Sequence, residues 1–289
     1  MIESNLREAV KFLSDHIGER SFRNLPALEK SASYIEERFR ECGLGPERQK
    51  FEYFGNTYFN LIAKVPGPPS MSTGPGALPL IVGAHYDTVE GSPGADDNAS
   101  GVAALLELAR FLSETPPARP VTLAAFSLEE PPAFGGSRMG SHVYAKGLKD
   151  RGDEIYGMIS LEMLGYYSDV KKSQFYPLPA FRFMYPDRGN FIAFVGDLTS
   201  RRLTRGFKKI FRSVSPFPVE SLNASPLIPG ISFSDHYSFW KMGYHAFMVT
   251  DTAFYRNPNY HARGDTWDTL DYARMARLVQ GLCETIKRI

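Results

Sequence analysis

Short, continuous apolar runs recur along this chain and alternate with segments in which apolar residues have helical spacing. Such runs are typical of strands covered on both faces, because a strand with one solvated face would alternate apolar and polar residues. Strands are predicted over residues 78–83, 121–126, 156–161, 190–195 and 245–249, and helices over 6–17, 28–42, 101–112, near 137–145, 198–211 and 270–289. This order predicts an α/β fold with a mixed, largely parallel central sheet flanked by helices and some antiparallel pairing at one edge.

The first part of the chain predicts the antiparallel pair. Residues 51–54 and 57–65 have strand composition and are separated by Gly55-Asn56, which favours a tight turn. The loop rich in Pro, Gly and Ser over 66–77 is too short to connect two domains. A length of 289 residues suits one α/β unit, so we expect a single domain over residues 1–289.

The composition is that of an ordinary globular protein, with 43% hydrophobic and 22% charged residues. A formal net charge of +1 without a block of like charges favours neither nucleic acid nor an acidic membrane surface as a partner. Cys42 and Cys283 form no CxxC motif and predict packed side chains rather than a disulfide framework or a thiolate zinc site. The N-terminus lacks the basic start and apolar core of a signal peptide. We therefore expect a cytoplasmic monomer, or the mature form of an exported protein.

Metal-ligating side chains follow four of the predicted strands. His85 follows the first apolar run, Glu129 and Glu130 the second, Glu162 the third, and His261 comes after the last run and a loop. The carboxyl ends of parallel strands meet at one edge of a sheet, where α/β proteins build their sites. Carboxylates that leave buried strands need a partner, and carboxylates combined with imidazole suit zinc. The pattern predicts a metal site in this crevice.

Three acids accompany His85 in the stretch from Gly83 to Gly101. Asp87 lies two residues after the histidine, and Asp96 and Asp97 stand together before the helix predicted at 101–112. Either of the paired acids is a candidate ligand, and Asp96 is also placed to cap the helix. The sequence alone favours a divalent cation here without deciding which acid binds it.

These residues occur in motifs that resemble the family-28 zinc metallopeptidases, the group of bacterial leucyl aminopeptidases, glutamate carboxypeptidase and animal glutaminyl cyclase. The resemblance runs in order from about residue 80 to 270. Its motifs are His85-Tyr86-Asp87, Gly94-Ala95-Asp96-Asp97-Asn98-Ala99-Ser100-Gly101, Glu129-Glu130, Leu161-Glu162-Met163-Leu164-Gly165, and Tyr260-His261 before Asp265-Thr266. It implies the zinc-dependent exopeptidase fold, of phosphorylase/hydrolase-like architecture. No inserted domain is visible, which disfavours the glutamate carboxypeptidase branch.

The resemblance also implies roles. Asp97 would bridge two zinc ions, His85 and Glu162 would complete one metal shell, and Glu130 and His261 the other. Glu129 would act as the general base. Asp87 would accept the second ring N–H of His85, and Tyr260 would stabilise the oxyanion. Position 162 is Asp in many aminopeptidases of the family, so its Glu changes the geometry in which a substrate amine is bound.

Other residues keep alternative interpretations. A serine triad in Ser234-Asp235-His236 is disfavoured, because three consecutive residues cannot present a nucleophile, base and acid in line; Asp235 and His236 are predicted to cap a helix or support the site. His245, before an apolar run, is predicted to pack. Asp251 is placed either to brace a loop or to contact substrate. Aromatic residues within 175–185 and 254–255 would line an apolar pocket or belong to the core.

The sequence therefore predicts a zinc-dependent aminopeptidase acting on peptides with a free N-terminus, whose ammonium group would lie against Glu129 and Glu162. One alternative is a glutaminyl-peptide cyclotransferase. The other is a non-catalytic binding module on the same fold, although no ligand of the family pattern is missing from the sequence.

Overall fold

The centre of the computed structural model, which describes residues 1–68 and 78–289, is one sheet with the strand order β1-β2-β4-β3-β5-β8-β6-β7. Most of the loop predicted over 66–77 lies outside the described residues. The strands are β1 Glu47–Tyr53, β2 Asn56–Val65, β3 Leu80–His85, β4 Val121–Phe126, β5 Gly157–Glu162, β6 Ile192–Gly196, β7 Val219–Asn223 and β8 Ala246–Thr250.

The sheet confirms the mixed, largely parallel architecture. Strands β4, β3, β5 and β8 form a parallel centre, and β1 and β2 extend it with antiparallel pairing, as predicted. A second antiparallel pairing, between β6 and β8, lies on the other side of the parallel centre and was not predicted. The chain leaves β5 at the carboxyl edge and reaches β6 through residues 163–191 without a crossing α-helix. It therefore re-enters the sheet from the same edge, in the opposite direction.

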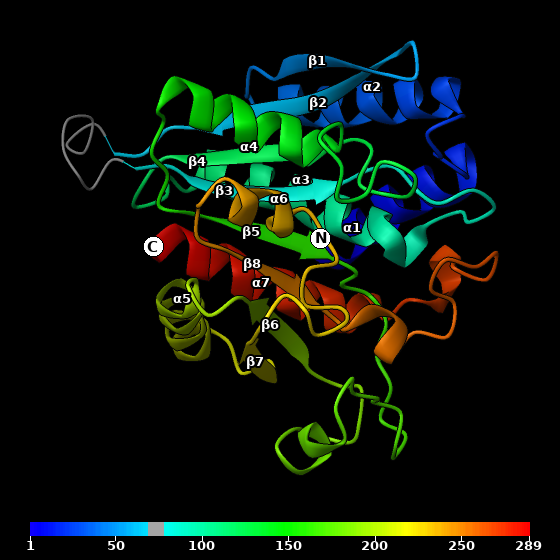
Figure 1. Ribbon diagram of the computed structural model, residues 1–289, viewed down its shortest axis with the longest axis vertical. Helices are drawn as coiled ribbons and strands as arrows, with labels where there is room; N and C mark the ends of the chain where they lie inside the picture. Colours follow the sequence, from blue (N-terminus) through cyan, green and yellow to red (C-terminus); the bar gives the residue numbers. More distant parts are fainter. Residues whose placement is uncertain (69–77) are drawn as a thin grey trace.

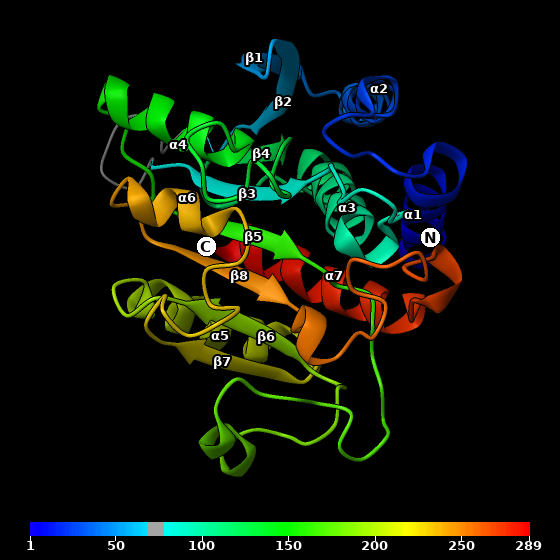
Figure 2. The same ribbon diagram turned by 45° about the vertical axis from the view of Figure 1, so that its right-hand side comes forward.

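Helices cover both faces of the sheet (Figures 1 and 2). Residues Leu80, Val82 and Ala84 of β3 face the larger layer, and Ile81 faces the smaller one. The larger layer comprises α1 Ile2–Lys11, α2 Leu25–Glu41, α3 Gly101–Glu114, α5 Arg201–Val214 and α7 Tyr272–Arg288. The smaller layer comprises α4 Gly140–Arg151 and α6 His236–Lys241. Because apolar cores cover both faces of the sheet, side chains on both sides of the parallel strands are apolar. This accounts for the continuous apolar runs in the sequence.

The predicted helices are present, with shifted ends. The segment predicted over 6–17 is α1 followed by a π-helical turn over Phe12–Ile17. The side chain of Asn24 accepts a hydrogen bond from the amide of Ala27 and begins α2, and Asp271 caps α7 in the same way. Two elements were not predicted: β7 is mostly half-buried, and α6 has six residues. Neither is long or periodic enough to give a sequence signal.

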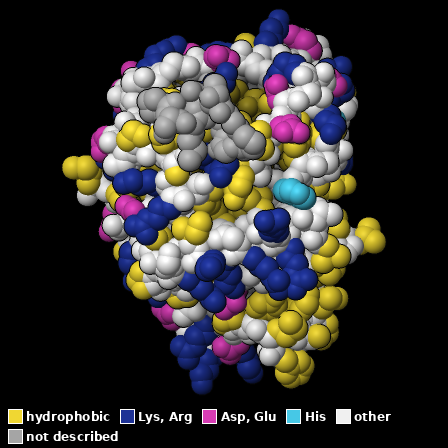
Figure 3. All heavy atoms as spheres, turned by 90° about the vertical axis from the view of Figure 1, so that its left-hand side faces the viewer, with side chains coloured by type: hydrophobic (Ala, Val, Ile, Leu, Met, Phe, Trp, Pro, Cys, Tyr) yellow, Lys and Arg dark blue, Asp and Glu magenta, His cyan; other side chains and the backbone are white. Residues whose placement is uncertain are grey.

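Helix α5 concentrates positive charge on one side. Its buried residues are Thr204, Phe207 and Phe211, and Arg201, Arg202, Arg205, Lys209 and Arg212 are exposed. Lys and Arg side chains gather in the lower half of the face seen in Figure 3, the half in which α5 lies in Figure 1. The distribution is that of an amphipathic surface helix. Among the described helices, none has both the length and the apolar character needed to cross a membrane.

Candidate metal centre

The parallel strands deliver the predicted ligands to one edge of the sheet. His85 and Glu162 are the last residues of β3 and β5, and Glu129 and Glu130 follow β4. Leu128 before the acid pair and Met163 after Glu162 have φ angles of 60° and 49°. Left-handed backbone is costly for such side chains and recurs at functional sites, where it redirects the chain. These turns keep the acids at the crevice.

Ligand atoms form two groups that share Asp97. The Nε2 atom of His85 lies 3.3 Å from Oδ1 of Asp97 and 3.4 Å from Oε2 of Glu162. The Nε2 atom of His261 lies 3.2 Å from the other Asp97 oxygen, Oδ2, and 3.3 Å from Oε2 of Glu130. His85, Asp97 and Glu130 also offer ligand atoms that all lie within 4.8 Å of one another. All five residues named from the sequence as ligands therefore meet.

The donor set fits zinc. In a tetrahedral site with metal–ligand bonds of the length usual for zinc, neighbouring ligand atoms are about 3.3 to 3.4 Å apart. The four separations from the two histidines to the carboxylates of their groups, from 3.2 to 3.4 Å, agree with that value. The buried Nε2 atom of His85 has no hydrogen-bond partner among the described residues. A buried polar atom without a partner is costly, and a cation at this position would satisfy it.

Asp87 supports the site through both its main-chain carbonyl oxygen and its carboxylate. Nδ1 of His85 lies 3.2 Å from the main-chain carbonyl oxygen of Asp87 and 3.6 Å from its carboxylate. The carboxylate instead accepts hydrogen bonds from the amides of Glu129 and Glu130, both at 3.1 Å. Because a carbonyl oxygen only accepts, it places the proton on Nδ1 and leaves the Nε2 lone pair facing Asp97. Asp87 thus meets the second ring N–H of His85 with its main-chain carbonyl oxygen, while its carboxylate fixes the amides of the acid pair.

Asp97 is held from two sides. The carboxylate of Asp265 accepts hydrogen bonds from the amides of Asp96 and Asp97, at 2.9 and 3.0 Å. On the other side, Oδ1 of Asn98 accepts from the amide of Met163 at 3.1 Å, and its Nδ2 donates to the carbonyl of Leu161 at 2.9 Å. The loop that carries Asp97 is thus joined to the end of β5. The motif that contains Asp265 was recognised in the sequence, whereas this role was not.

Asp96 faces away from the two ligand groups. Its Oδ1 accepts from the amide of Gly165 at 2.9 Å and its Oδ2 from the side chain of Asn257 at 2.8 Å, so it does not cap a helix. The neighbouring Asp251 accepts from the amides of Ala253 and Tyr166, at 2.8 and 3.1 Å. Burial raises the pKa of Asp251 to about 6. Of its two predicted alternatives, Asp251 therefore braces loops.

Ser234 and His236 do not form a triad. The Oγ of Ser234 donates to Oε2 of Glu162 at 2.7 Å and lies 2.7 Å from the Oγ of Ser160. His236 instead donates from Nε2 to the carbonyl of Ile231 at 2.8 Å. The side chain of Asp235 makes no cap bond to α6, so the predicted capping role is wrong. His245 is exposed rather than packed, because it precedes the buried part of β8.

Arg20 is a buried residue of this region that the sequence did not reveal. Its guanidinium donates at 2.8 Å to five main-chain carbonyls, those of Leu13, Gly18, Tyr86, Pro93 and Gly94. Although burial lowers the pKa of Arg20 to about 10, the group stays charged at neutral pH. The cation thus fixes the segment between His85 and Asp97. No local pattern marks such a residue, since its partners are distant carbonyls.

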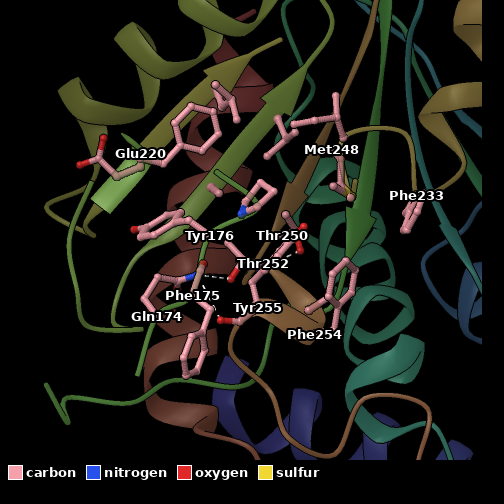
Figure 4. A pocket seen from close by; sticks show the side chains of 18 of the residues that line it. Gln174, Phe175, Tyr176, Glu220, Phe233, Met248, Thr250, Thr252, Phe254 and Tyr255 are labelled. Carbon is pink, nitrogen blue, oxygen red and sulfur yellow. Dashed lines mark hydrogen bonds between the residues drawn. The ribbon is translucent and has the colours of Figure 1, made fainter. Parts of the chain in front are cut away.

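A cavity that is partly open to solvent (Figure 4) includes the ligand Glu162 in its lining. Glu162 and Tyr260 line it, and the Tyr260 ring stacks on His261 with 3.8 Å between the ring centroids. The remaining wall is largely apolar, includes eight aromatic residues, and comes from residues 174–195, 220–233 and 248–255. The aromatic segments whose place was left open in the sequence, Phe175 to Tyr185 and Phe254-Tyr255, thus contribute side chains to a pocket.

Comparison with known proteins agrees with this geometry. The sequence pattern of Peptidase family M28 matches residues 60–286. The chain is 43% identical over 286 residues to the uncharacterized protein YfbL of Escherichia coli (strain K12), covering 96% of this chain and 85% of that protein. It is 27% identical over 264 residues to a probable leucine aminopeptidase of Arthroderma otae (strain ATCC MYA-4605 / CBS 113480), covering 85% of this chain and 62% of that protein. The chain thus spans less than two thirds of this second relative.

Solved structures share the fold. BSAP, a zinc aminopeptidase from Bacillus subtilis, matches with a TM-score of 0.76 and 16% identity, covering 98% of this chain and 94% of that chain. A glutaminyl cyclase from Bacteroides thetaiotaomicron, bound to N-acetylhistamine, matches with a TM-score of 0.72 and 17% identity, covering 99% and 98%. At these identities the likeness establishes the fold, and the reaction has to be argued from the site.

The two ligand groups predict a metal stoichiometry. We expect the purified protein to bind about two zinc ions per chain, and H261A to bind about one, because His85, Glu162 and Asp97 stay in place. D97A should lose both, since both groups share this carboxylate. Metal analysis after dialysis measures the ratio, and H245A is the matched control because His245 is exposed and outside both groups. Two tightly held ions in D97A would contradict the shared ligand.

His236 predicts a pH dependence of stability. Burial lowers its pKa to about 4, whereas an unfolded histidine titrates near pH 6.5. Between these values only the unfolded state binds the proton, so stability falls as the pH falls. From about pH 7 to about pH 5 this residue should cost about 2 kcal/mol of unfolding free energy. Urea unfolding of wild type and H236Q at both pH values isolates the contribution; an equal loss in the two proteins would contradict it.

Proposed function

The chain belongs to Peptidase family M28, and we propose that it is a zinc-dependent aminopeptidase that releases N-terminal residues from peptides. The observation that carries the proposal is the pair of ligand groups sharing Asp97, with a further buried carboxylate beside them. Glu129 is 6% exposed, and its Oε2 lies 4.0 Å from Nε2 of His85, beyond the separations within the ligand groups. It is thus placed next to the cations without being needed to hold them.

When bound, two zinc ions supply Lewis acidity that polarises a carbonyl and lowers the pKa of water. His85, Glu162 and Asp97 would hold one, and His261, Glu130 and Asp97 the other. Glu129 would accept a proton from the attacking water and deliver it to the leaving amine. The amides of Glu129 and Glu130 both donate to Asp87, which fixes the main chain at the two acids. The two side chains leave this fixed main chain in different directions, so that Glu130 can hold a cation while Glu129 stays unligated.

Carboxylates at the cavity entrance favour a substrate with a free amine. Glu162 lines the cavity, and Oε2 of Glu129 lies 4.0 Å from Nε2 of His85, which is itself 3.4 Å from Oε2 of Glu162. An ammonium group would gain charge-assisted hydrogen bonds from such carboxylates. Ser234 holds the longer side chain of Glu162 by donating to its Oε2, which compensates for the change from Asp. Tyr260 would donate from its hydroxyl to the oxyanion, since a phenol keeps its proton at neutral pH.

The general-base role of Glu129 predicts a separation of activity from metal content. E129Q removes the proton acceptor and leaves the five ligands, so kcat for an aminoacyl anilide should fall about 10²- to 10⁴-fold with zinc content unchanged. Metal analysis and anilide hydrolysis measure the two quantities on one preparation. E154Q is the matched control, because Glu154 is exposed. Loss of zinc in E129Q would instead exchange the roles of Glu129 and Glu130.

The same assays test the alternatives. With a peptide that begins with glutamine, an aminopeptidase releases free glutamine, whereas a cyclase releases ammonia and leaves pyroglutamate on the peptide. Pyroglutamyl product without free amino acid would refute the peptidase proposal. A protein with neither bound metal nor chelator-sensitive activity would be the non-catalytic module.

The lining of the cavity predicts a side-chain preference. Away from Tyr260, the hydroxyl groups of the lining tyrosines are engaged within the protein: Tyr176 donates to Pro186, Tyr185 to Ser221 and Tyr255 to Pro229. The carboxylate of Glu220 lies 3.5 Å from Nζ of Lys208. A charged side chain would therefore lose its hydration without gaining a partner, whereas an aromatic ring would meet other rings.

We accordingly expect anilides of Phe and Leu to be hydrolysed with a kcat/KM about tenfold or more above those of Ala, Gln and Lys. Ala reaches little of the wall, and Gln and Lys carry polar groups into it. Initial rates on this panel at equal enzyme concentration measure the order. Preference for Lys would show that Glu220 is available to substrate despite Lys208.

A further inference from the structure

We propose that Gln174 is a specificity-determining residue: it positions the aromatic wall of the cavity and thereby sets the affinity for large N-terminal side chains. The inference rests on the proposed aminopeptidase function only in taking this cavity as the subsite for the substrate's first side chain. Gln174 touches no ligand of the metal centre in the described structure, so it acts through the wall and is a positioning residue.

Part of the wall comes from a segment that has little regular structure of its own. Residues 163–191 join β5 to β6 and contain only a short 3₁₀ turn, Pro179–Phe183. Five aromatic lining residues belong to this segment: Phe175, Tyr176, Phe181, Tyr185 and Phe191. In Figure 1 the segment extends from the lower end of the molecule, away from both helical layers. Its position over the cavity therefore depends on specific bonds.

Gln174 supplies those bonds from a buried position. Its Nε2 donates to Oγ1 of Thr252 at 2.8 Å, and its Oε1 accepts from Nε of Arg256 at 2.9 Å. Next to it, the amide of Phe175 donates to the carbonyl of Tyr255 at 2.8 Å. Figure 4 shows the side chain directed from the aromatic segment to the segment of Thr252 and Tyr255. Gln174 is 5% exposed, so these bonds are shielded from water.

The hydrogen bond between Arg256 and Gln174 is costly to lose, because Arg256 is buried. Arg256 is 6% exposed, and its guanidinium lies 4.7 Å from the centroid of the Phe191 ring. Its Nη2 has no hydrogen-bond partner among the residues that the structure describes. Losing the acceptor at Nε would leave a second buried N–H group unpaired, which is costly. The pair favours one position of the wall, because Oε1 of Gln174 is the acceptor that satisfies Nε of Arg256.

This geometry separates binding from chemistry. A large side chain would contact Tyr176 and its aromatic neighbours, whereas alanine is too short to reach beyond the entrance. The metal ligands are braced by Asp87, Asp265 and Asn98, none of which contacts Gln174. A loosened wall should thus weaken binding of large substrates and leave zinc binding and kcat unchanged.

The test compares Q174L with wild type on Phe, Leu and Ala anilides. We expect KM for the Phe and Leu substrates to rise about tenfold, with KM for the Ala substrate and every kcat within about twofold. Q174E keeps an acceptor for Arg256 and should recover part of the affinity. Q49L is the matched control. Gln49 on β1 accepts a hydrogen bond from Asn60 on β2, and neither residue lines the cavity.

A binding measurement keeps the proposal testable without turnover. The zinc-loaded proteins are titrated calorimetrically with L-phenylalaninol and with L-alaninol. We expect Q174L to bind phenylalaninol about tenfold more weakly than wild type does, and to bind alaninol equally well. If phenylalaninol binding is selectively weakened in Q174L but wild type hydrolyses no peptide, the proposed aminopeptidase function is refuted and the positioning role of Gln174 is supported. Hydrolysis by wild type with equal losses for both alcohols, a uniform fall in kcat, or no change in Q174L would overturn the positioning role.

Discussion

The sharing of one buried carboxylate, that of Asp97, determines the rest of the site. Its two oxygens face different histidines, at 3.3 Å from His85 and 3.2 Å from His261. Asp97, Glu129, Glu130 and Glu162 are each at most 6% exposed. So many carboxylates are costly to bury together without cations. The fold therefore has to hold Asp97 rigidly enough for one side chain to serve both groups, and much of the surrounding hydrogen bonding does so.

Two carboxylates outside the ligand groups fix the main chain beside the ligands by accepting hydrogen bonds from adjacent amides. Asp265 accepts from the amides of Asp96 and Asp97, and Asp87 accepts from those of Glu129 and Glu130. A carboxylate that receives adjacent amides fixes the main chain at the ligand rather than the ligand's own side chain, which stays free to bind a cation. The buried charge of Arg20 complements them by binding carbonyls on the segment between His85 and Asp97. Amides and carbonyls of the same loops are thus satisfied by opposite charges.

The sequence predicted the features that depend on local pattern. Strands β3, β4 and β5 are continuous apolar runs, so His85, Glu130 and Glu162 were found at their ends. The direction of β6 was not predictable, because it depends on the path of residues 163–191, which have no regular periodicity. Arg20 and the acceptor atom of His85 were missed for a related reason: main-chain carbonyls are their partners, and every residue carries one. That residues 175–185 line a cavity could not be separated from burial in a core, since both need aromatic side chains.

One stretch, residues 250–261, serves both the cavity and the metal centre. Thr252 and Tyr255 line the cavity, and His261 lies at the end of the stretch with a φ of 55°. Asn257 stands between them and donates to Asp96, next to the shared ligand, while Asp251 fixes the start of the stretch on Tyr166. Asn257 therefore lies between the cavity wall and His261 along the chain. Its hydrogen bond to Asp96 should limit how far a displacement of the wall is passed on to His261. The cavity and the candidate metal ligands thus share one segment, and they are held at different points of it.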